Sequence, residues 1–423
     1  MVYVIAMEKS KRSLRGLVRT TALGLELVAV GGLFGCGSGN SNTYTPTQQP
    51  TPTKQLEVIV PSGNGLEVIK NSSPSTVTVP GVTSIYWALD GFIGATGAPV
   101  ANDTNFILLL NQNQQVTYTL GLLNTPNLSV ITPNGILCAA STKPLQGLPD
   151  IFMINAAGTS PKFIGTPQPI GGTTYLTASP NGASCLFTNG NLNNPAKITE
   201  VDTSTANETQ IPINATFATY SPDSKTIWAG TTTANSPSLT VVDDATKNVT
   251  KTYQLPGAGI TGPVIFNGAQ EVYTSTAAAA NEGANILVVN TSTQQLATIS
   301  STLGNDTAVP PFLALSPDTK WLTAIVKTTD AQGNFKYTLV IVDTSSNLVK
   351  TTMDLATFPV NTNVAGFGYA AASSDGVCMG WTGGTAGGSG TLYLLDMSNL
   401  SLRTVPLTST PTGAFTITYT TSP

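Results

Sequence analysis

From about residue 56 onward, short apolar runs rich in Val, Leu and Thr alternate with polar turns that contain Pro, Asp, Asn and Gly. Pro presets φ for the second position of a type I turn, Asp or Asn suits the third, and Gly accepts the left-handed conformation that follows. The runs between turns are too short, and too rich in Thr and Val, for crossover helices. The pattern predicts antiparallel hairpins and an all-β chain.

The turns recur with a period of roughly 45 residues, which is the mark of a repeat architecture. After each turn, a second apolar run closes on Asp or Asn, as in Leu339-Val340-Ile341-Val342-Asp343. Each repeat therefore predicts four antiparallel strands. The turn copies are Leu89-Asp90-Gly91, Pro133-Asn134-Gly135, Pro180-Asn181-Gly182, Pro222-Asp223-Ser224, Phe266-Asn267-Gly268, Pro317-Asp318-Thr319 and Ser374-Asp375-Gly376.

The third strand of each repeat is apolar on both faces, whereas a strand in an open antiparallel sheet has one polar face. A run such as Val340-Ile341-Val342 must therefore be covered on each side, which happens when sheets stack around an axis. First strands with many small residues, such as Tyr369–Ser373, fit a crowded centre. Four-stranded sheets that stack with a fixed period predict a β-propeller.

Seven internal repeats can be counted, and apolar runs remain at both ends of the chain. Residues 56–79 read as later strands of a unit and residues 415–419 as a first strand, so together they predict one composite blade that closes the ring. This favours eight blades; if the leftovers only complete an existing blade, the number is seven. The internal units are residues 82–124, 125–172, 173–214, 215–258, 259–308, 309–362 and 363–408.

Ser-Pro-Asp turns followed by Val-Val-Asp runs resemble the YVTN-type repeats of bacterial surface and periplasmic propellers, which lactonase-like propellers share. The resemblance extends from about residue 56 to the end of the chain. It implies a fold far more than an activity, because the family is functionally broad. Lactonase-like propellers are expected to place His and Arg around the central mouth, and no such set can be carried over to this sequence.

The N-terminus has the order of a secretory signal: basic residues, then an apolar stretch, then small residues. Leu33-Phe34-Gly35-Cys36 resembles a bacterial lipobox, in which the cysteine becomes the lipidated first residue. We therefore expect a signal peptide at residues 1–35, a Thr/Pro-rich tether at 36–55 and a single propeller domain at 56–423. Acylation of Cys36 would anchor the exported protein to a membrane of the bacterial cell envelope, either in the outer membrane or facing the periplasm. The alternative is an ordinary signal peptide, with Cys36 incidental.

Beyond Cys36, three cysteines remain: Cys138, Cys185 and Cys378. Because three is odd, at least one thiol stays free or pairs with another molecule. Cys138 and Cys185 each lie three residues after the Gly of a matching turn. We expect them at the same position of successive repeats, as small buried apolar residues. A disulfide between them is the less favoured alternative.

Composition then narrows the chemistry. The chain has no histidine, which removes Ser/His/Asp and Cys/His nucleophile systems and imidazole metal sites. Only 9% of residues are charged, and Arg403 is the one arginine after residue 35. A lone Arg cannot form a phosphate-binding cluster, so we expect no nucleic-acid partner. No calcium loop or phosphate cradle is recognisable, and we expect no cofactor and no metal.

The carboxylates repeat with the turns, so structural roles are favoured over catalysis. Asp223, Asp318 and Asp375 mark blade corners; Asp202, Asp343 and Asp396 end third strands, as does the adjacent pair Asp243 and Asp244. The tryptophans at 87, 228, 321 and 381 are favoured as blade packing over a ligand platform. Two acids could still run a glycosidase, but no pair singles itself out.

The connections between second and third strands differ from one another and must emerge on one face of the disc. Such variable loops commonly form a binding surface, here suited to hydrogen bonding with a peptide, glycan or protein. We therefore expect a non-catalytic binding or scaffold module; the alternatives are a lactonase-like or carboxylate-dependent hydrolase and a structural subunit of an envelope assembly. The loops span roughly residues 92–105, 141–150, 188–197, 230–238, 275–285, 327–337 and 382–390. Candidate binding-face residues are Asp103, Lys143, Asp150, Glu282, Asp330 and Trp381.

Overall fold

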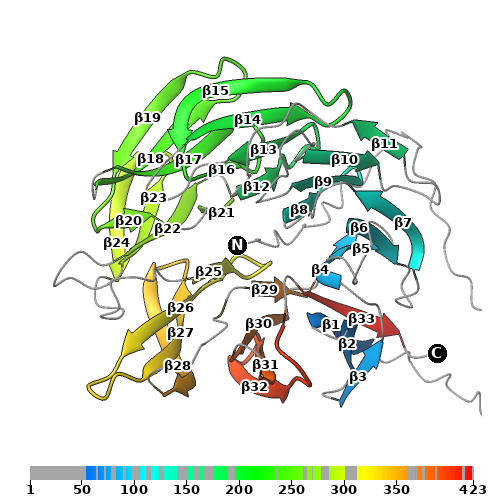
Figure 1. Cartoon of the computed structure of the whole chain (residues 1–423). Coiled ribbons are helices and arrows are strands. Elements are labelled where there is room, and N and C mark those ends of the chain that lie inside the picture. The colour runs from blue at the N-terminus through cyan, green and yellow to red at the C-terminus, as the bar shows by residue number, and fades with distance from the viewer. Residues whose placement is uncertain are drawn as a thin grey trace, which may run out of the picture.

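The computed structural model is built from β-strands arranged as a ring of sheets around a centre (Figure 1). It describes residues 54–62, 65–70, 73–77, 82–88, 92–97, 105–110, 116–122, 128–140, 151–155, 162–165, 175–188, 196–233, 236–260, 264–268, 270–277, 285–300, 312–359, 367, 369–373, 377–385, 388–411 and 415–421. The predicted signal peptide, Cys36 and nearly all of the predicted tether lie outside these residues. Among the described residues, no helix has the length and apolar character needed to cross a membrane.

Within the described strands the chain forms eight antiparallel sheets, seven of them from consecutive strands. The prediction of an all-β propeller of antiparallel sheets is confirmed. We number the seven sheets made of consecutive strands in chain order. Sheet 1 is β4 (Val82–Ala88), β5 (Phe92–Gly97), β6 (Asn105–Leu110) and β7 (Val116–Leu122). Sheet 2 is β8 (Leu128–Ile131), β9 (Ile136–Ala140), β10 (Ile151–Asn155) and β11 (Lys162–Gly165). Sheet 3 is β12 (Tyr175–Ala178), β13 (Ser184–Thr188), β14 (Ala196–Asp202) and β15 (Glu208–Ala215).

The remaining sheets repeat this plan, with one first strand broken into two pieces. Sheet 4 is β16 (Phe217–Tyr220), β17 (Thr226–Thr233), β18 (Ser236–Asp243) and β19 (Val249–Gln254). Sheet 5 is β20 (Gly259–Ile260), β21 (Ile265–Asn267), β22 (Glu271–Ala277), β23 (Asn285–Asn290) and β24 (Gln295–Ser300). Sheet 6 is β25 (Phe312–Leu315), β26 (Trp321–Thr329), β27 (Phe335–Asp343) and β28 (Leu348–Phe358). Sheet 7 is β29 (Tyr369–Ala372), β30 (Cys378–Gly384), β31 (Gly390–Asp396) and β32 (Ser401–Pro406).

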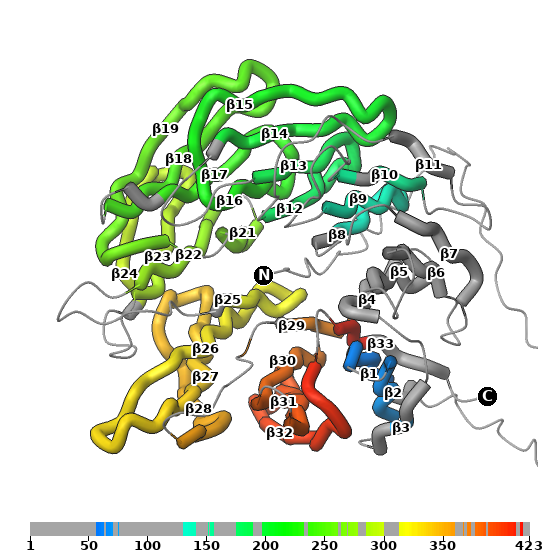
Figure 2. The backbone as a smooth tube through the Cα atoms, in the orientation of Figure 1, coloured from blue at the N-terminus to red at the C-terminus, as the bar shows by residue number. Residues whose placement is uncertain are grey.

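The eighth, or closing, sheet joins the two ends of the chain, in the order β3-β2-β1-β33. β1 (Lys54–Ser62) pairs with β33 (Thr416–Thr421), and β2 (Gly65–Lys70) and β3 (Ser73–Val77) complete it. The prediction that both ends contribute to one sheet is confirmed. In Figure 2 the blue N-terminal and red C-terminal tubes lie side by side at this point.

Burial follows strand position within each sheet. Third strands whose burial is described have a long buried stretch: β23 is buried from Asn285 to Val289, and β27 from Leu339 to Val342. The fourth strands lie at the rim in Figure 1 and are mostly exposed, as β19 and β32 show. Third strands with two apolar faces are thus confirmed, since each is covered by the sheets on either side.

Candidate binding face and inter-sheet sites

The antiparallel order of each sheet gives the ring two faces. The turns between first and second strands and between third and fourth strands emerge on one side, which we call the turn face. The connections between second and third strands, and those between successive sheets, emerge on the other side, which we call the loop face. Each candidate residue that the structure describes belongs to one face or to the interior between them.

Serine and aspartate side chains hold the turns between first and second strands in shape. The Ser316 hydroxyl accepts a hydrogen bond from the Trp321 amide at 3.0 Å and donates one to the Asp318 carboxylate at 2.6 Å. The residue after Asp318, Thr319, has φ of 60°, the conformation that the turn chemistry requires. Ser221 and Asp223 make the same bonds in sheet 4. Asp375 lies outside the described residues.

The aspartates that end the third strands cap the next turn. Asp343 accepts hydrogen bonds from the Ser345 hydroxyl and amide, at 2.6 and 2.9 Å. These bonds, the hydroxyl first, hold the pKa of Asp343 below its ordinary value. Asp202, Asp243 and Asp396 make equivalent bonds and their pKa values are lowered too. The prediction that these aspartates form turns is confirmed, and no metal-binding group of His, Cys, Asp or Glu occurs among the described residues.

Four of the six residues predicted for the binding face (Asp103, Lys143, Asp150 and Glu282) lie outside the described residues. The other two are placed. The connections themselves are less uniform than expected. β17 and β18 run on until Thr233 pairs with Ser236, and β26 and β27 until Thr329 pairs with Phe335. Most of the predicted loops 230–238 and 327–337 are therefore strand, because Thr-rich polar sequence pairs in a hairpin as readily as it forms a loop.

Asp330 organises the tip of the β26–β27 hairpin. Its carboxylate accepts hydrogen bonds from the amides of Gln332 and Asn334, at 2.9 and 2.8 Å, and from the Asn334 side-chain amide at 2.9 Å. These bonds, led by the Asn334 side chain, lower the pKa of Asp330. Asp330 therefore remains an exposed anion on the loop face that also shapes its own turn.

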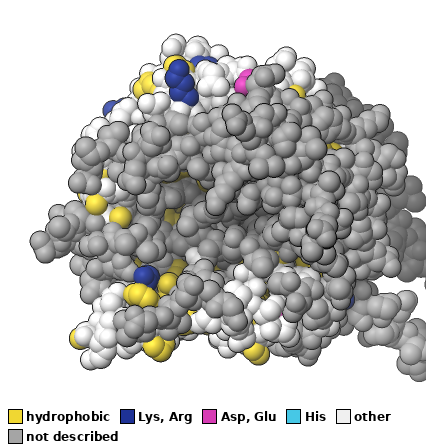
Figure 3. All heavy atoms as spheres, viewed as in Figure 1, with side chains coloured by type: hydrophobic (Ala, Val, Ile, Leu, Met, Phe, Trp, Pro, Cys, Tyr) yellow, Lys and Arg dark blue, Asp and Glu magenta, His cyan; other side chains and the backbone are white. Residues whose placement is uncertain are grey.

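The same hairpin carries a cation over an aromatic ring. Lys327 Nζ lies 3.9 Å from the centroid of the half-buried Phe335 ring, close enough for a cation–π contact. Figure 3 shows hydrophobic side chains beside a Lys or Arg side chain at the lower left, the region of sheet 6 in Figure 1. Sequence reasoning missed this pair. The spacing of Lys327 and Phe335 across a hairpin could have revealed it only with the strand register known.

Trp381 is fully buried between sheets 6 and 7. It packs in a cluster with Tyr337, Phe367 and Tyr393, whose rings form a chain with centroids 4.8 and 5.2 Å apart. Its indole Nε1 has no hydrogen-bond partner. The position fits the packing role that the sequence favoured for tryptophans, and the indole does not reach the surface as a ligand platform.

Between sheets 3 and 4 the structure buries a polar network that the sequence did not predict. Glu200 accepts hydrogen bonds from the hydroxyls of Ser184 and Tyr220, at 3.1 and 2.7 Å, and forms an ion pair with Lys247. Lys247 also binds Asp244 at 2.8 Å. Desolvation opposes protonation of Lys247, but the hydrogen bonds and charges of Asp244 and Glu200 outweigh it and raise its pKa. Burial and the charge of Glu200 raise the pKa of Tyr220, so the phenol stays protonated.

A related bond joins sheets 5 and 6. The Asn347 side-chain amide donates to Glu271 Oε1 at 2.9 Å, and the Tyr273 hydroxyl lies within hydrogen-bond distance of both residues. Asn347 and Lys247 hold the same place, four residues after the aspartate that ends the third strand, with φ of 56° and 58°. In both cases this turn residue reaches back to an acid in the preceding sheet. Such networks link neighbouring sheets through polar side chains.

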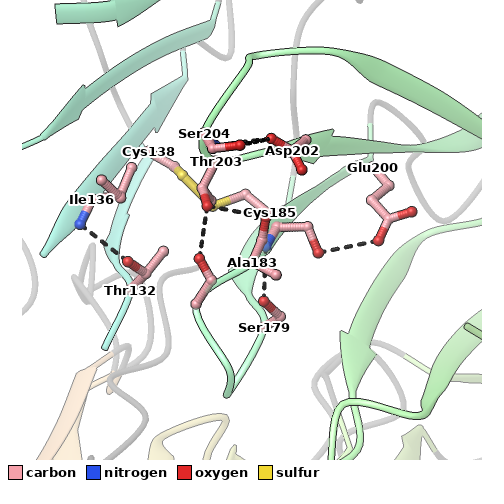
Figure 4. The surroundings of a disulfide bond; sticks show 12 residues. Thr132, Ile136, Cys138, Ser179, Ala183, Cys185, Glu200, Asp202, Thr203 and Ser204 are labelled. Carbon is pink, nitrogen blue, oxygen red and sulfur yellow. Dashed lines mark hydrogen bonds between the residues drawn. A yellow bond between two sulfur atoms is a disulfide. The ribbon is translucent and has the colours of Figure 1, made fainter. Parts of the chain in front are cut away.

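A disulfide joins sheets 2 and 3, which corrects the sequence interpretation. Cys138 on β9 and Cys185 on β13 are both fully buried and bonded to each other (Figure 4). Sequence reasoning placed them at equivalent positions, but the turn before β9 is one residue shorter. The Thr132 amide donates a hydrogen bond to the carbonyl of Ile136, whereas the Ser179 amide donates one to the carbonyl of Ser184, so the second turn contains one more residue. A shift of one residue turns a side chain to the opposite face of a sheet, so the two sulfurs face each other. Cys378 is buried in sheet 7, outside the disulfide.

No protein-family model matches the sequence, and no curated protein matches it. Among solved structures, the chain is similar to the dihydro-heme d1 dehydrogenase NirN in complex with DHE, with a TM-score of 0.60 and 12% identity over 86% of this chain and 75% of that one. It is also similar to a eukaryotic initiation factor, with a TM-score of 0.52 and 9% identity over 85% and 97% of the two chains. Identities this low bear on the fold alone. What the comparisons establish for this chain is a β-propeller.

Proposed function

We propose that this protein is a lipid-anchored propeller of the bacterial cell envelope, with YVTN-type repeats and eight blades, one for each sheet. Its role is to bind a peptide, glycan or protein partner through the loop face, without catalysis. The anchor is acylated Cys36, and the Thr/Pro-rich tether links it to the ring.

The observation that carries the proposal is a difference between the two faces: the turn face repeats the same hydrogen-bonded turns, whereas the loop face has connections that vary from sheet to sheet. On the turn face, aspartates such as Asp318 and Asp343 are saturated by hydrogen bonds from their own turns. On the loop face, the connections differ from sheet to sheet: β17–β18 close tightly, whereas β26–β27 carry an exposed tip with Asp330. A repeated face with fixed bonds suits a scaffold, and a varied face suits recognition.

The Cys138–Cys185 disulfide supports an exported location. Disulfides persist in oxidising compartments such as the periplasm and the cell surface, and are rare in a reducing cytosol. This one is fully buried between two sheets, where it serves packing and cross-linking rather than exchange with external thiols.

The binding role can be tested by site-specific photocrosslinking in intact cells. A photoreactive residue replaces exposed Gln332 on the loop face or, as a matched control in the same sheet, exposed Lys320 on the turn face. We expect a discrete crosslinked product from position 332 and none from position 320. Products from position 320 alone would contradict a loop-face binding site.

Two further measurements separate the proposal from its rivals. Metabolic labelling with a fatty-acid probe should mark the wild type and not Cys36→Ser. Turnover of sugar lactones or glycosides that is abolished by one Asp or Glu substitution on the loop face would favour the carboxylate-dependent hydrolase instead.

A further inference from the structure

The closing sheet shows on which face the chain enters the ring. β33 is the innermost strand of this sheet, and first strands elsewhere end at the turn face, as β16 does where it runs into the Ser221 turn. In the register between β1 and β33, Lys54 pairs with Thr421, the last residue of β33. The N-terminal end of β1 therefore lies at the turn face.

Contacts at the opposite end of β1 give the same result independently. Ser62, the last residue of β1, forms a β-bridge with Pro411, in the connection between β32 and β33. Nearby, the buried carboxylate of Glu67 accepts hydrogen bonds from the Thr408 amide at 2.9 Å and from the Ser409 amide at 3.1 Å. Connections between successive sheets belong to the loop face, so β1 runs from the turn face at Lys54 to the loop face at Ser62.

The charges of the turn face decide how that face meets a lipid surface. Its described turns expose more carboxylates than cations, and an acidic surface is repelled by anionic headgroups within about one Debye length, roughly 8 Å at physiological salt. The exposed or half-exposed groups are Asp202, Asp223, Asp243, Asp244, Asp318, Asp343 and Asp396, against Lys225, Lys247 and Lys320. A spacer is therefore needed between this face and the membrane.

The sequence supplies that spacer. Residues 37–53, which precede β1, are rich in Thr and Pro, and such a segment reaches about 50 Å when extended at about 3.1 Å per residue. Because the spacer joins the ring at Lys54, an anchor at Cys36 is connected to the ring on its turn face.

We propose that the turn face is directed toward the membrane, held off it by residues 37–53, and that the loop face is directed away from the membrane. This inference rests on the lipid anchor proposed above. The inference adds an orientation to that anchor. The loop face meets partners in the aqueous compartment and is kept away from the lipid to which the protein is attached.

The test is energy transfer from a labelled residue to an acceptor dye on lipid headgroups. Acylated protein is placed on phosphatidylethanolamine–phosphatidylglycerol vesicles, and a donor is attached to Lys320→Cys on the turn face or to Gln332→Cys on the loop face. Both residues are exposed and flank the same strand, β26. Nine residues at about 3.3 Å each separate them by about 30 Å, so transfer from position 320 should exceed that from position 332 by at least about twofold. Wild-type protein, in which Cys378 is buried, gives the background of labelling.

The outcomes separate the orientation from the anchor. Protein that floats with vesicles but transfers equally from both positions, or more from position 332, overturns the orientation and leaves the anchor standing. If Cys36 is not acylated, the anchor fails; a hexahistidine segment in place of residues 1–36, bound to nickel-chelating lipids, then tests the same geometry. Stronger transfer from position 320 in that form still supports the turn-face attachment, and the reverse overturns it.

Discussion

Sheet 3 contacts its two neighbours through apolar interfaces that contain different kinds of cross-link. Toward sheet 2 the contact is apolar and contains the Cys138–Cys185 disulfide among Phe187, Met153 and Val201. Toward sheet 4 the apolar contact ends in the buried network of Glu200 and Lys247. Both interfaces are filled by apolar side chains, and each has an added link between sheets, which is covalent in one and ionic in the other. The two should differ in what disrupts them: a reductant for the first, and loss of one charged partner for the second.

Removing the disulfide should have the largest effect. For Cys138→Ala with Cys185→Ala, loss of a cross-link over a sequence separation of 47 residues is expected to lower the free energy of unfolding by about 4 kcal/mol, on the chain-entropy estimate. Denaturant titration measures the change. Wild type in reductant should fall to the level of the variant, while the variant should not respond to reductant. Equal stability of the two proteins without reductant would show that the cross-link does not stabilise this interface.

On the other side of sheet 3, Lys247→Met should cost about 2–3 kcal/mol, because it leaves the Glu200 carboxylate largely buried without its cation. Met occupies the same left-handed position as Lys, so backbone strain does not change between the two. The double variant with Glu200→Gln should lose less than the sum of the single changes. Additive losses in this cycle would mean that the two side chains do not interact energetically. Reductant should alter none of these differences.

A third substitution tests whether the hydrogen bond from Asn347 to Glu271 stabilises the contact between sheets 5 and 6, as the Glu200–Lys247 ion pair is expected to stabilise the contact between sheets 3 and 4. Asn347→Gly keeps the left-handed conformation and removes the hydrogen bond to Glu271, for an expected loss of about 1 kcal/mol. Gln294→Gly is the matched control, because Gln294 is exposed and has φ of 56° at the same turn position. It should be neutral or slightly stabilising. A similar loss in both variants would assign the effect to the backbone instead of the contact.

The smallest effect concerns pH and the turns that lie outside both interfaces. The folded-state pKa of Asp343 is below its ordinary value of 3.8, led by the Ser345 hydroxyl bond. A lowered pKa contributes stability above the unfolded-state value, and that stability is lost as pH falls through the folded-state value, below about pH 4. Asp343→Asn should keep the turn, as Asn290 does in sheet 5, and reduce the acid-side fall in the unfolding midpoint. An unchanged acid limb would contradict the capping role.

The fold could be predicted because its determinants are local. Ser316 and Asp318 shape a turn within a few residues, and Val340 to Val342 reveal burial on both faces by composition alone. The interface chemistry depends on register, which the sequence does not show directly. Counting from Gly135 and Gly182 placed Cys138 and Cys185 alike, whereas the hydrogen-bonded pairs place them on opposite faces. Lys247 did leave a signal: it is the one cation among the equivalent turn residues Ala206, Gln294, Asn347 and Leu400.

The pairing of β1 with β33 also has a consequence for biosynthesis. β1 finds its partner only in residues 416–421, so a ribosome-bound fragment that lacks these residues cannot complete the ring. A truncated chain that ends before residue 416 leaves the inner edge of β1 unpaired. An unpaired strand edge promotes aggregation. Ring closure therefore reports on synthesis, because β1 gains its inner neighbour only after the strand at residues 416–421 has been made.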